Sequence, residues 1–515
     1  MARRAQPIAA LSAAVVLALT LGTLAAVFAR ASGLPELGPA DLAALRFTIL
    51  QATLSAILSA ALAVPVARAL ARRRFPGRGI LITLLGAPFI LPVIVAVLGL
   101  LAVFGRAGLF NRGLEFLGLP PVTIYGLQGV VLAHVFFNLP LATRLILQGW
   151  LSIPAERFRL AASLSMGPSE IARFLERPML RSVLPGTVTA IFLICLTSFA
   201  VALTLGGGPR ATTIELAIYQ AFRFDFDLGR AAALASVQFV LCLLAVLLAG
   251  RAARETGFGA GLDRQVERWD AGSVWLKVQD AAALILVSIF LLLPLGALLE
   301  AGLPRLATLP APVWESALRS LAVAVSSAVL ILVLALPLAL AAAGRRQAGL
   351  WEISAMLPLT ASSLVTGTGL FILLRPFFAP GDVALPVTVL VNAAMALPFA
   401  YRSLLPPARD AETDFGRLAE SLGMTGLARL RLVTLPRLRR PLGFALGLTA
   451  ALSMGDLGVI ALFAGEETAT LPLQLYRLMG AYRMADAAGA AVLLLGLSLA
   501  LFWVFDRGGR VNARA

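Results

Sequence analysis

Long apolar runs, separated by short polar segments, recur along the whole chain. A run of about 20 apolar residues is long enough for a helix to cross the hydrocarbon core of a bilayer. The runs predict twelve spans, near residues 8–29, 46–70, 80–104, 122–148, 186–204, 230–250, 278–300, 313–343, 349–374, 383–405, 442–463 and 486–505. Because a helix satisfies its own backbone hydrogen bonds, the pattern indicates an all-α polytopic membrane protein.

Arginine clusters carry most of the positive charge and flank these runs. They lie at Arg3, Arg4, Arg72, Arg73, Arg74, Arg78, Arg345, Arg346, Arg507 and Arg510. With twelve spans all of them fall on one side of the membrane, and the positive-inside rule then places both termini in the cytoplasm. The net charge of +16 is therefore assigned to orientation and not to a nucleic-acid partner. The first run is interpreted as a retained span, because it is long and lacks a clear signal-peptide cleavage site.

One polar, arginine-rich segment occurs twice in this apolar chain. The first copy, Arg159–Met166, reads RLAASLSM, and the second copy, Arg417–Met424, reads RLAESLGM. Equivalent positions are 258 residues apart without a gap, and Pro140 matches Pro398 at the same separation. An internal repeat of this kind indicates two related halves. Because both copies follow an equivalent span, we expect parallel repeats that enclose a central pathway.

The repeat divides the chain. The predicted parts are a first six-span repeat (1–250), a cytoplasmic linker (251–277) and a second six-span repeat (278–515). Each copy of the polar segment is predicted to form two short helices joined at Ser165 or Gly423, because small residues suit a tight turn. Pro178 and Pro436 are expected to end the second helix before the next span begins. We therefore expect a compact helical elbow in each half.

The spacing of the elbow resembles the EAA loop of ABC-importer permeases, in which a glycine is followed thirteen positions later by Leu-Pro. Gly423 and Pro436 fit this pattern, whereas Ser165 and Pro178 fit its spacing alone. The resemblance implies the type I ABC-importer permease fold, with each elbow docked on an ATPase subunit.

The two loops lie near 156–185 and 412–441. The family's opening glutamate is Arg159 in one half and Arg417 in the other, so the ionic partner at the docking site is expected to differ. The positions expected to couple the permease to the ATPase are Arg159, Ala161, Ala162, Ser165, Met166, Gly167, Pro178, Arg417, Ala419, Glu420, Gly423, Met424 and Pro436.

The sequence offers no catalytic site and no metal site. A Walker A loop needs a glycine-rich turn and a lysine on the phosphates, and the one lysine, Lys277, follows no such turn. His134 is the sole histidine, and the two cysteines, Cys195 and Cys242, fall in predicted spans without metal-ligand spacing. We expect a transport subunit and not an enzyme, without a cofactor of its own, while ATP and Mg are bound by a separate ATPase.

A short segment after the fifth predicted span carries more specific information. Glycines near the start of Leu205–Gln220 stop the membrane helix, and Thr212 and Glu215 have capping-box spacing for a short outer-face helix. Its counterpart is Thr470–Tyr476. This rim, the twelve-span layout and the segment Ser453–Phe463 resemble the permeases of bacterial thiamine importers. The resemblance implies a multi-pass inner-membrane protein that imports thiamine and its phosphates, with a periplasmic binding protein and two ATPase copies.

Asp456 is the most unusual residue of the predicted spans, and it lies opposite Ser198 at the 258-residue separation. A carboxylate in a membrane is costly unless it has a partner or faces a wet cavity. Asp456 therefore either lines the pathway and attracts a cationic solute, or caps the backbone or pairs with an arginine. Tyr219 and Tyr476 are candidates to stack on an aromatic ligand, although tyrosine commonly anchors a helix at the interface. The residues expected to line the solute pathway are therefore Asp456, Ser198, Tyr219 and Tyr476.

Two alternatives stay open. A ferric-iron ABC importer permease has a similar layout, because the binding protein does most of the selecting in such systems. A twelve-span secondary transporter is also built of parallel halves, but it predicts ionisable residues in several central spans and no repeated elbow. Apart from protein partners, only membrane lipid is expected to contact the chain.

Overall fold

The computed structural model describes residues 2–31, 37–86, 90–252, 268–344 and 348–510. Eleven helical segments in these ranges are long and apolar enough to cross a membrane. A twelfth span is a pair of helices, Ala348–Thr360 and Ser363–Leu374, bent by 92°. No strand occurs in the described ranges. The expected all-α polytopic fold with about twelve spans is confirmed.

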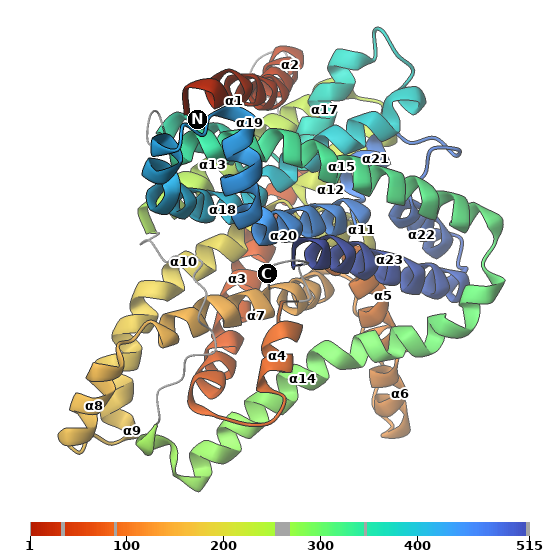
Figure 1. Cartoon of the computed structure of the whole chain (residues 1–515). Coiled ribbons are helices and arrows are strands. Elements are labelled where there is room, and N and C mark those ends of the chain that lie inside the picture. Colours follow the sequence, from red (N-terminus) through yellow and green to blue (C-terminus); the bar gives the residue numbers. More distant parts are fainter. Residues whose placement is uncertain (1, 32–36, 87–89, 253–267, 345–347, 511–515) are drawn as a thin grey trace.

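The first half of the chain supplies six of these spans and the first copy of the polar segment. Figure 1 shows how its helices are arranged. Its helices are α1 (Ala2–Leu17), η1 (Ala18–Gly22), α2 (Thr23–Arg30), α3 (Pro39–Arg72), α4 (Arg78–Leu84), α5 (Val93–Phe104), α6 (Leu109–Phe116), α7 (Leu127–Leu151), α8 (Ala155–Ser163), α9 (Pro168–Ile171), η3 (Ala172–Glu176), α10 (Arg177–Leu196), α11 (Ala200–Leu205), η4 (Pro209–Ala211), α12 (Ile214–Arg223) and α13 (Leu228–Ala252).

The second half repeats this order after the linker, of which 253–267 lie outside the described residues. Its helices are η5 (Trp269–Ala271), α14 (Val274–Gly302), η6 (Leu303–Thr308), α15 (Ala311–Ala343), α16 (Ala348–Met356), η7 (Leu357–Thr360), α17 (Ser363–Leu374), α18 (Pro380–Ser421), α19 (Gly426–Arg429), η8 (Leu430–Thr434), α20 (Leu435–Met454), α21 (Gly458–Phe463), α22 (Leu471–Gly480) and α23 (Met484–Arg510).

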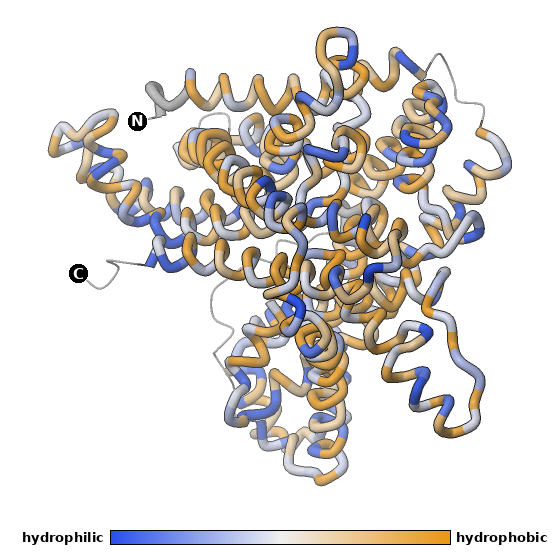
Figure 2. The backbone as a smooth tube through the Cα atoms, turned by 90° about the vertical axis from the view of Figure 1, so that its right-hand side faces the viewer, coloured by the Kyte–Doolittle hydropathy of each residue, from blue (hydrophilic) through white to orange (hydrophobic). Residues whose placement is uncertain are grey.

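Large apolar side chains cover the outside of the bundle. On α14, for example, Trp275 is 67% exposed and Leu286 is 66% exposed. Figure 2 shows that hydrophobic residues predominate along most of the tube, whereas hydrophilic residues gather in short clusters. Water would not favour so much exposed apolar surface, but lipid tails are its natural solvent.

The first helix of each half packs against the other half. Helices α1 and α2 lie on α15 and α17, and α14 lies on α3 and α5. A glycine stands at one crossing in each half: a Cβ on Gly99 would lie 2.7 Å from the carbonyl oxygen of Pro294, and a Cβ on Gly369 would collide with the carbonyl oxygen of Thr23. These glycines allow the close backbone approach. The two halves are therefore interlocked.

Two of the predicted spans, near 80–104 and 349–374, contain a helix break. The backbone leaves helical geometry at Pro92 before α5 and at Ser362 before α17, and the Oγ of Ser362 accepts a hydrogen bond from the backbone nitrogen of Val365 at 3.1 Å. The sequence analysis did not anticipate these breaks, although the prolines beside them, Pro92 and Pro358, are a local signal for the end of a helix.

Candidate functional site

The two polar segments form the same turn. Helix α8 ends at Ser163, and the backbone nitrogens of Ser165 and Met166 donate to the carbonyl oxygens of Ala162 and Ala161, both at 3.0 Å. This pair of hydrogen bonds defines a Schellman motif, which satisfies carbonyl groups at the end of a helix.

The second half repeats the motif at the 258-residue separation. The backbone nitrogens of Gly423 and Met424 donate to the carbonyl oxygens of Glu420 and Ala419, at 3.0 and 2.8 Å. The motif requires a left-handed residue after the helix, usually glycine. Gly423 has φ +65°, and Ser165 occupies the same position with φ +55°. The bend that the sequence predicts at these two residues is confirmed.

The arms of each elbow differ from the expected pair of short helices. In the first half α8 is separate from α7, with Pro154 at the break, but in the second half the first arm is the end of the 42-residue helix α18. The prolines do not end the second arm either. Pro178 and Pro436 lie in the first turn of α10 and α20, each directly after a π-helical turn, η3 or η8. Each proline therefore lies inside a continuous helical segment, and the π-helical turn directly before it accommodates the missing hydrogen bond and the proline ring.

We call residues 155–176 the first elbow and residues 412–434 the second elbow. Figure 1 shows both towards its left side, away from α6 and α22. Small side chains line the inside of each turn: Ala161 and Ala419 are buried, and Gly167 caps α9 through a hydrogen bond from its nitrogen to Glu170 Oε2 at 2.8 Å. Glu420 is exposed and lies 3.9 Å from the guanidinium of Arg429. The positions predicted to couple the permease thus lie within the two elbows, except Pro178 and Pro436, which lie just beyond them in α10 and α20.

Each elbow also presents an exposed surface that the sequence analysis missed. Leu160 and Leu164 are 62% and 59% exposed, one helical turn apart. Their equivalents at the 258-residue separation, Leu418 and Leu422, are 54% and 63% exposed. The predicted residues Arg159 and Arg417 precede the leucines and are also exposed. The i, i+4 spacing of identical leucines in both copies was the signal that could have identified them.

Ser198 and Asp456 lie at two equivalent helix breaks. Ser198 lies between α10 and α11, and Asp456 lies between α20 and α21. Oδ1 of Asp456 accepts a hydrogen bond from the nitrogen of Gly458 at 3.2 Å, while Oδ2 is buried without a hydrogen-bond partner. No arginine pairs with Asp456 among the described residues. Ser198 is instead 2.8 Å from Nε2 of His134, in the first half. The two side chains therefore have separate partners.

The break at Asp456 lies where the halves meet. A Cβ on the preceding residue, Gly455, would lie 3.0 Å from Cα of Pro92 in the first half. A Cβ on Gly458 would lie 2.8 Å from Oγ of Ser363, at the start of α17. Both neighbouring residues border the bends that precede α5 and α17. Asp456 is thus at the junction of three helix breaks.

The predicted outer-face helices exist, but the expected cap is wrong. Helix α12 begins at Ile214, and its N-cap is Thr213, whose Oγ1 accepts from the nitrogen of Leu216 at 3.3 Å. Thr212 precedes the cap, and Glu215 is buried, so they form no capping box. In α22 the corresponding N-cap residue, Thr470, makes no side-chain capping bond.

The two tyrosines of these helices lie near each other. Tyr219 packs against Phe199, with ring centroids 5.2 Å apart, and is buried. Burial raises the pKa of Tyr476, and the nearby Tyr219 raises it further. Tyr219 and Tyr476 therefore lie near each other although they belong to different halves of the chain.

The described residues contain no group of three or more histidine, cysteine, aspartate or glutamate side chains that could hold a metal ion. Both cysteines are buried thiols and do not form a disulfide with each other.

Known proteins resemble this chain over most of its length. It is 41% identical over 478 residues to the thiamine transport system permease protein of Brucella abortus (strain 2308), which covers 91% of this chain and 88% of the relative. It is 43% identical over 473 residues to that of Escherichia coli (strain K12), covering 90% and 88%. The chain belongs to the thiamine transport system permease family. No protein-family model matches it.

Membership in this family of ABC-importer permeases makes the chain a transport subunit and not an enzyme. It also implies an ATPase and a solute-binding protein as partners. The helical spans of this thiamine transport permease agree with a multi-pass protein of the inner membrane.

Proposed function

We propose that the chain is the membrane-spanning permease of an ATP-driven importer that moves thiamine and its phosphates from the periplasm to the cytoplasm. The observation that carries the proposal is the repeated elbow. Two identical Schellman turns display the same exposed arginine and leucine pair at one end of an interlocked helical bundle. An apolar pair beside an arginine, exposed at a polar turn outside the spans, favours a protein partner, because water solvates the arginine but not the leucines.

Each elbow is proposed to dock on one copy of an ATPase, which binds ATP and Mg. Both elbows and both termini are then cytoplasmic, in agreement with the arginine distribution. The exposed leucines would enter an apolar groove of the ATPase, while Arg159 and Arg417 would meet acidic residues at its rim. The division of the chain into repeats 1–250 and 278–515 follows the same symmetry.

The solute pathway is proposed to run between the halves, past the helix breaks at Ser198 and Asp456. The free Oδ2 of Asp456 is a negative group that would attract the cationic thiazolium ring of thiamine. Tyr219 and Tyr476 would lie at the outer mouth, beneath a periplasmic binding protein. The names of the relatives support thiamine as the solute, and they give the ferric-iron alternative no support.

Cross-linking tests the docking. Ser163 and Ser421 are exposed, equivalent residues, and each Oγ donates to the carbonyl oxygen three residues earlier at 2.8 Å. Cysteine at either position should form an adduct with the ATPase, whereas Thr308→Cys, at the end of η6, should not. Adducts at neither elbow position would refute the docking.

Uptake tests the solute. Proteoliposomes that contain the assembled importer and its binding protein should accumulate labelled thiamine in an ATP-dependent manner. Accumulation of ferric iron without thiamine would contradict the proposal.

A further inference from the structure

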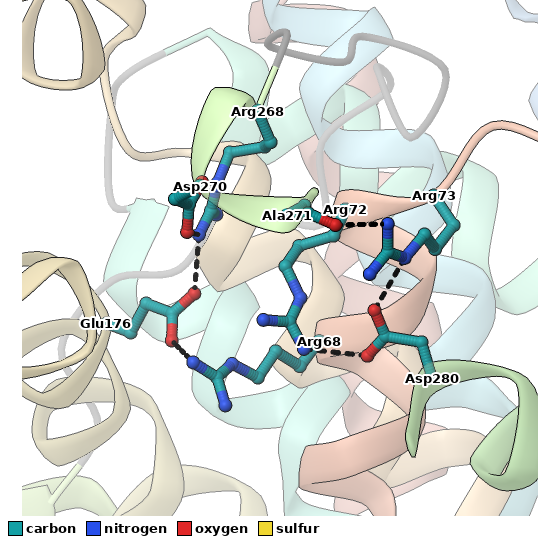
Figure 3. A network of polar contacts seen from close by, with 8 residues as sticks. All are labelled: Arg68, Arg72, Arg73, Glu176, Arg268, Asp270, Ala271 and Asp280. Carbon is teal, nitrogen blue, oxygen red and sulfur yellow. Dashed lines mark hydrogen bonds and ion pairs between the residues drawn. The ribbon is translucent and has the colours of Figure 1, made fainter. Parts of the chain in front are cut away.

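The end of the linker is held against the first elbow by a buried ionic network (Figure 3). Arg268 donates through Nε and Nη2 to the two carboxylate oxygens of Asp270, both at 2.7 Å, and through Nη2 to Oε1 of Glu176 at 3.0 Å. Its side chain is 3% exposed, and its guanidinium lies 4.8 Å from the ring centroid of Phe158. Arg268 therefore contacts both arms of the first elbow, at Phe158 in α8 and at Glu176 in η3.

The network continues to the second half. Oε2 of Glu176 accepts from Nη2 of Arg68 in α3 at 2.8 Å. One helical turn later, Arg72 and Arg73 bind the two oxygens of Asp280 in α14, both at 2.7 Å. The first elbow is thus connected through α3 to the first helix of the second half (Figure 3).

Arg268 and Asp270, at the centre of the network, keep their charges although they are buried. Burial alone would raise the pKa of Asp270, but the hydrogen bond and charge of Arg268 outweigh it and lower that pKa below its ordinary value. Burial alone would lower the pKa of Arg268, but Asp270 and Glu176 outweigh it and raise that pKa. Removal of one partner would leave the others buried and uncompensated.

Among the described residues, other groups hold the second elbow, and a guanidinium lies over an aromatic ring there too: Arg437 of α20 is 3.3 Å from the ring centroid of Phe415. At the 258-residue separation Glu176 corresponds to Thr434, and Phe158 corresponds to Gly416. Instead, Arg429 binds Glu412 at 2.7 Å within the second elbow itself. The two elbows share a turn but differ in what holds them.

Packing alone does not fix the base of the first elbow. A cavity of about 270 Å³ lies beside Arg268 and Phe158, bordered by the chain from Trp150 to Glu156. The indole nitrogen of Trp150 is buried there without a hydrogen-bond partner. The ionic contacts of Arg268 therefore bridge a region that is not filled by side chains.

We infer that Arg268 is a positioning residue for the first elbow, and that the linker makes the two ATPase contacts unequal. The inference rests on the coupling role of the elbows proposed above. A displacement of α14 or of the linker is passed to the first elbow through Glu176 and Phe158, whereas the described contacts of the second elbow are with α18 and α20.

The test uses a neutral variant of the full chain, Arg268→Met with Asp270→Asn, which removes one charge of each sign and leaves Glu176 paired with Arg68. Spin labels at Ser163→Cys and Ser421→Cys report the mobility of each elbow in the purified permease, without the ATPase. We expect the label at position 163 to become more mobile and the label at position 421 to stay unchanged. The mirror variant, Arg429→Met with Glu412→Gln, should mobilise position 421 alone. Equal changes at both positions, or no change at 163, would overturn the inference.

A second readout separates this inference from the proposed function. In the assembled importer, the neutral variant should lower the ATPase adduct at Ser163→Cys at least about fivefold and should leave that at Ser421→Cys within about twofold. Thiamine transported per ATP hydrolysed should also fall, which a defect of assembly alone would not cause. If the parent forms neither adduct, the proposed docking is wrong, while the spin labels still decide whether Arg268 positions the elbow.

Discussion

Gly423 tests the elbow geometry most directly, because only its backbone conformation restricts substitution. Its φ is +65°, and a Cβ at this position would meet no atom within 4 Å. An L-residue in the left-handed region costs about 1–2 kcal/mol, and a β-branched residue lies at the upper end of that range. If the ATPase docks only on the formed turn, about 1.4 kcal/mol corresponds to a tenfold fall in the docked fraction.

We therefore expect Gly423→Val to lower ATPase activity stimulated by the thiamine-loaded binding protein by about tenfold. Gly423→Ala should have a smaller effect, and Gly423→Asn should have little, because asparagine tolerates the left-handed region. The activity is measured in proteoliposomes and normalised to the amount of assembled complex. Ser165→Gly should relieve strain at the equivalent position and keep full activity.

The control lies at the other end of the same helix. Gly381 also has open space around its Cβ position, but its φ is ordinary, so Gly381→Val should leave the stimulated activity unchanged. The order of activities, with asparagine above alanine and alanine above valine, distinguishes backbone strain from a simple effect of size. Equal activities of the Asn and Val variants at position 423 would refute the reasoning.

Three further predictions concern other parts of the molecule. Asp456→Asn keeps an oxygen for the nitrogen of Gly458, so assembly should persist while thiamine uptake per assembled complex falls; unchanged uptake would exclude the pathway role. Burial raises the pKa of Glu215, in α12 outside the spans, from 4.5 to about 8. Stability should then fall as the pH rises from 4.5 to 8, by at most about 5 kcal/mol, and Glu215→Gln should flatten the pH dependence of the unfolding temperature; an equally steep variant would contradict this. Replacing Leu160 and Leu164 by serine should weaken ATPase binding at least about tenfold, and an unchanged affinity would exclude their docking role.

The spans and the turns could be predicted because each is encoded locally. A run of apolar residues is itself the signal for a span, and the left-handed position at Gly423 follows from one small residue after a helix. The packing of the first helix of each half on the other half also has a local signal. Gly99 and Gly369, where these helices cross, stand at matching positions of the two halves.

The remaining features depend on contacts that no local pattern contains. Arg268 and Glu176 are 92 residues apart, and Arg72 and Asp280 are 208 residues apart. In an arginine-rich chain each acidic residue has many possible partners, so only the fold decides the pairs. The breaks before α5 and α17 had a local signal in Pro92 and Pro358, because proline interrupts a helix, but the direction of the chain after each break depends on the neighbouring helices.

The internal repeat separates what the fold requires from what a partner requires. Ala161 and Ala419 are identical and buried, so packing inside the turn explains them. Leu160 and Leu418 are also identical but exposed, and packing within this chain cannot explain an apolar residue that touches little. The groups that hold each elbow have meanwhile diverged, from the contacts of Arg268 to the pair formed by Arg429. The exposed leucines are therefore the same in both elbows, although different contacts hold the two elbows in place. This is expected if two copies of one ATPase bind the two elbows of a fused permease.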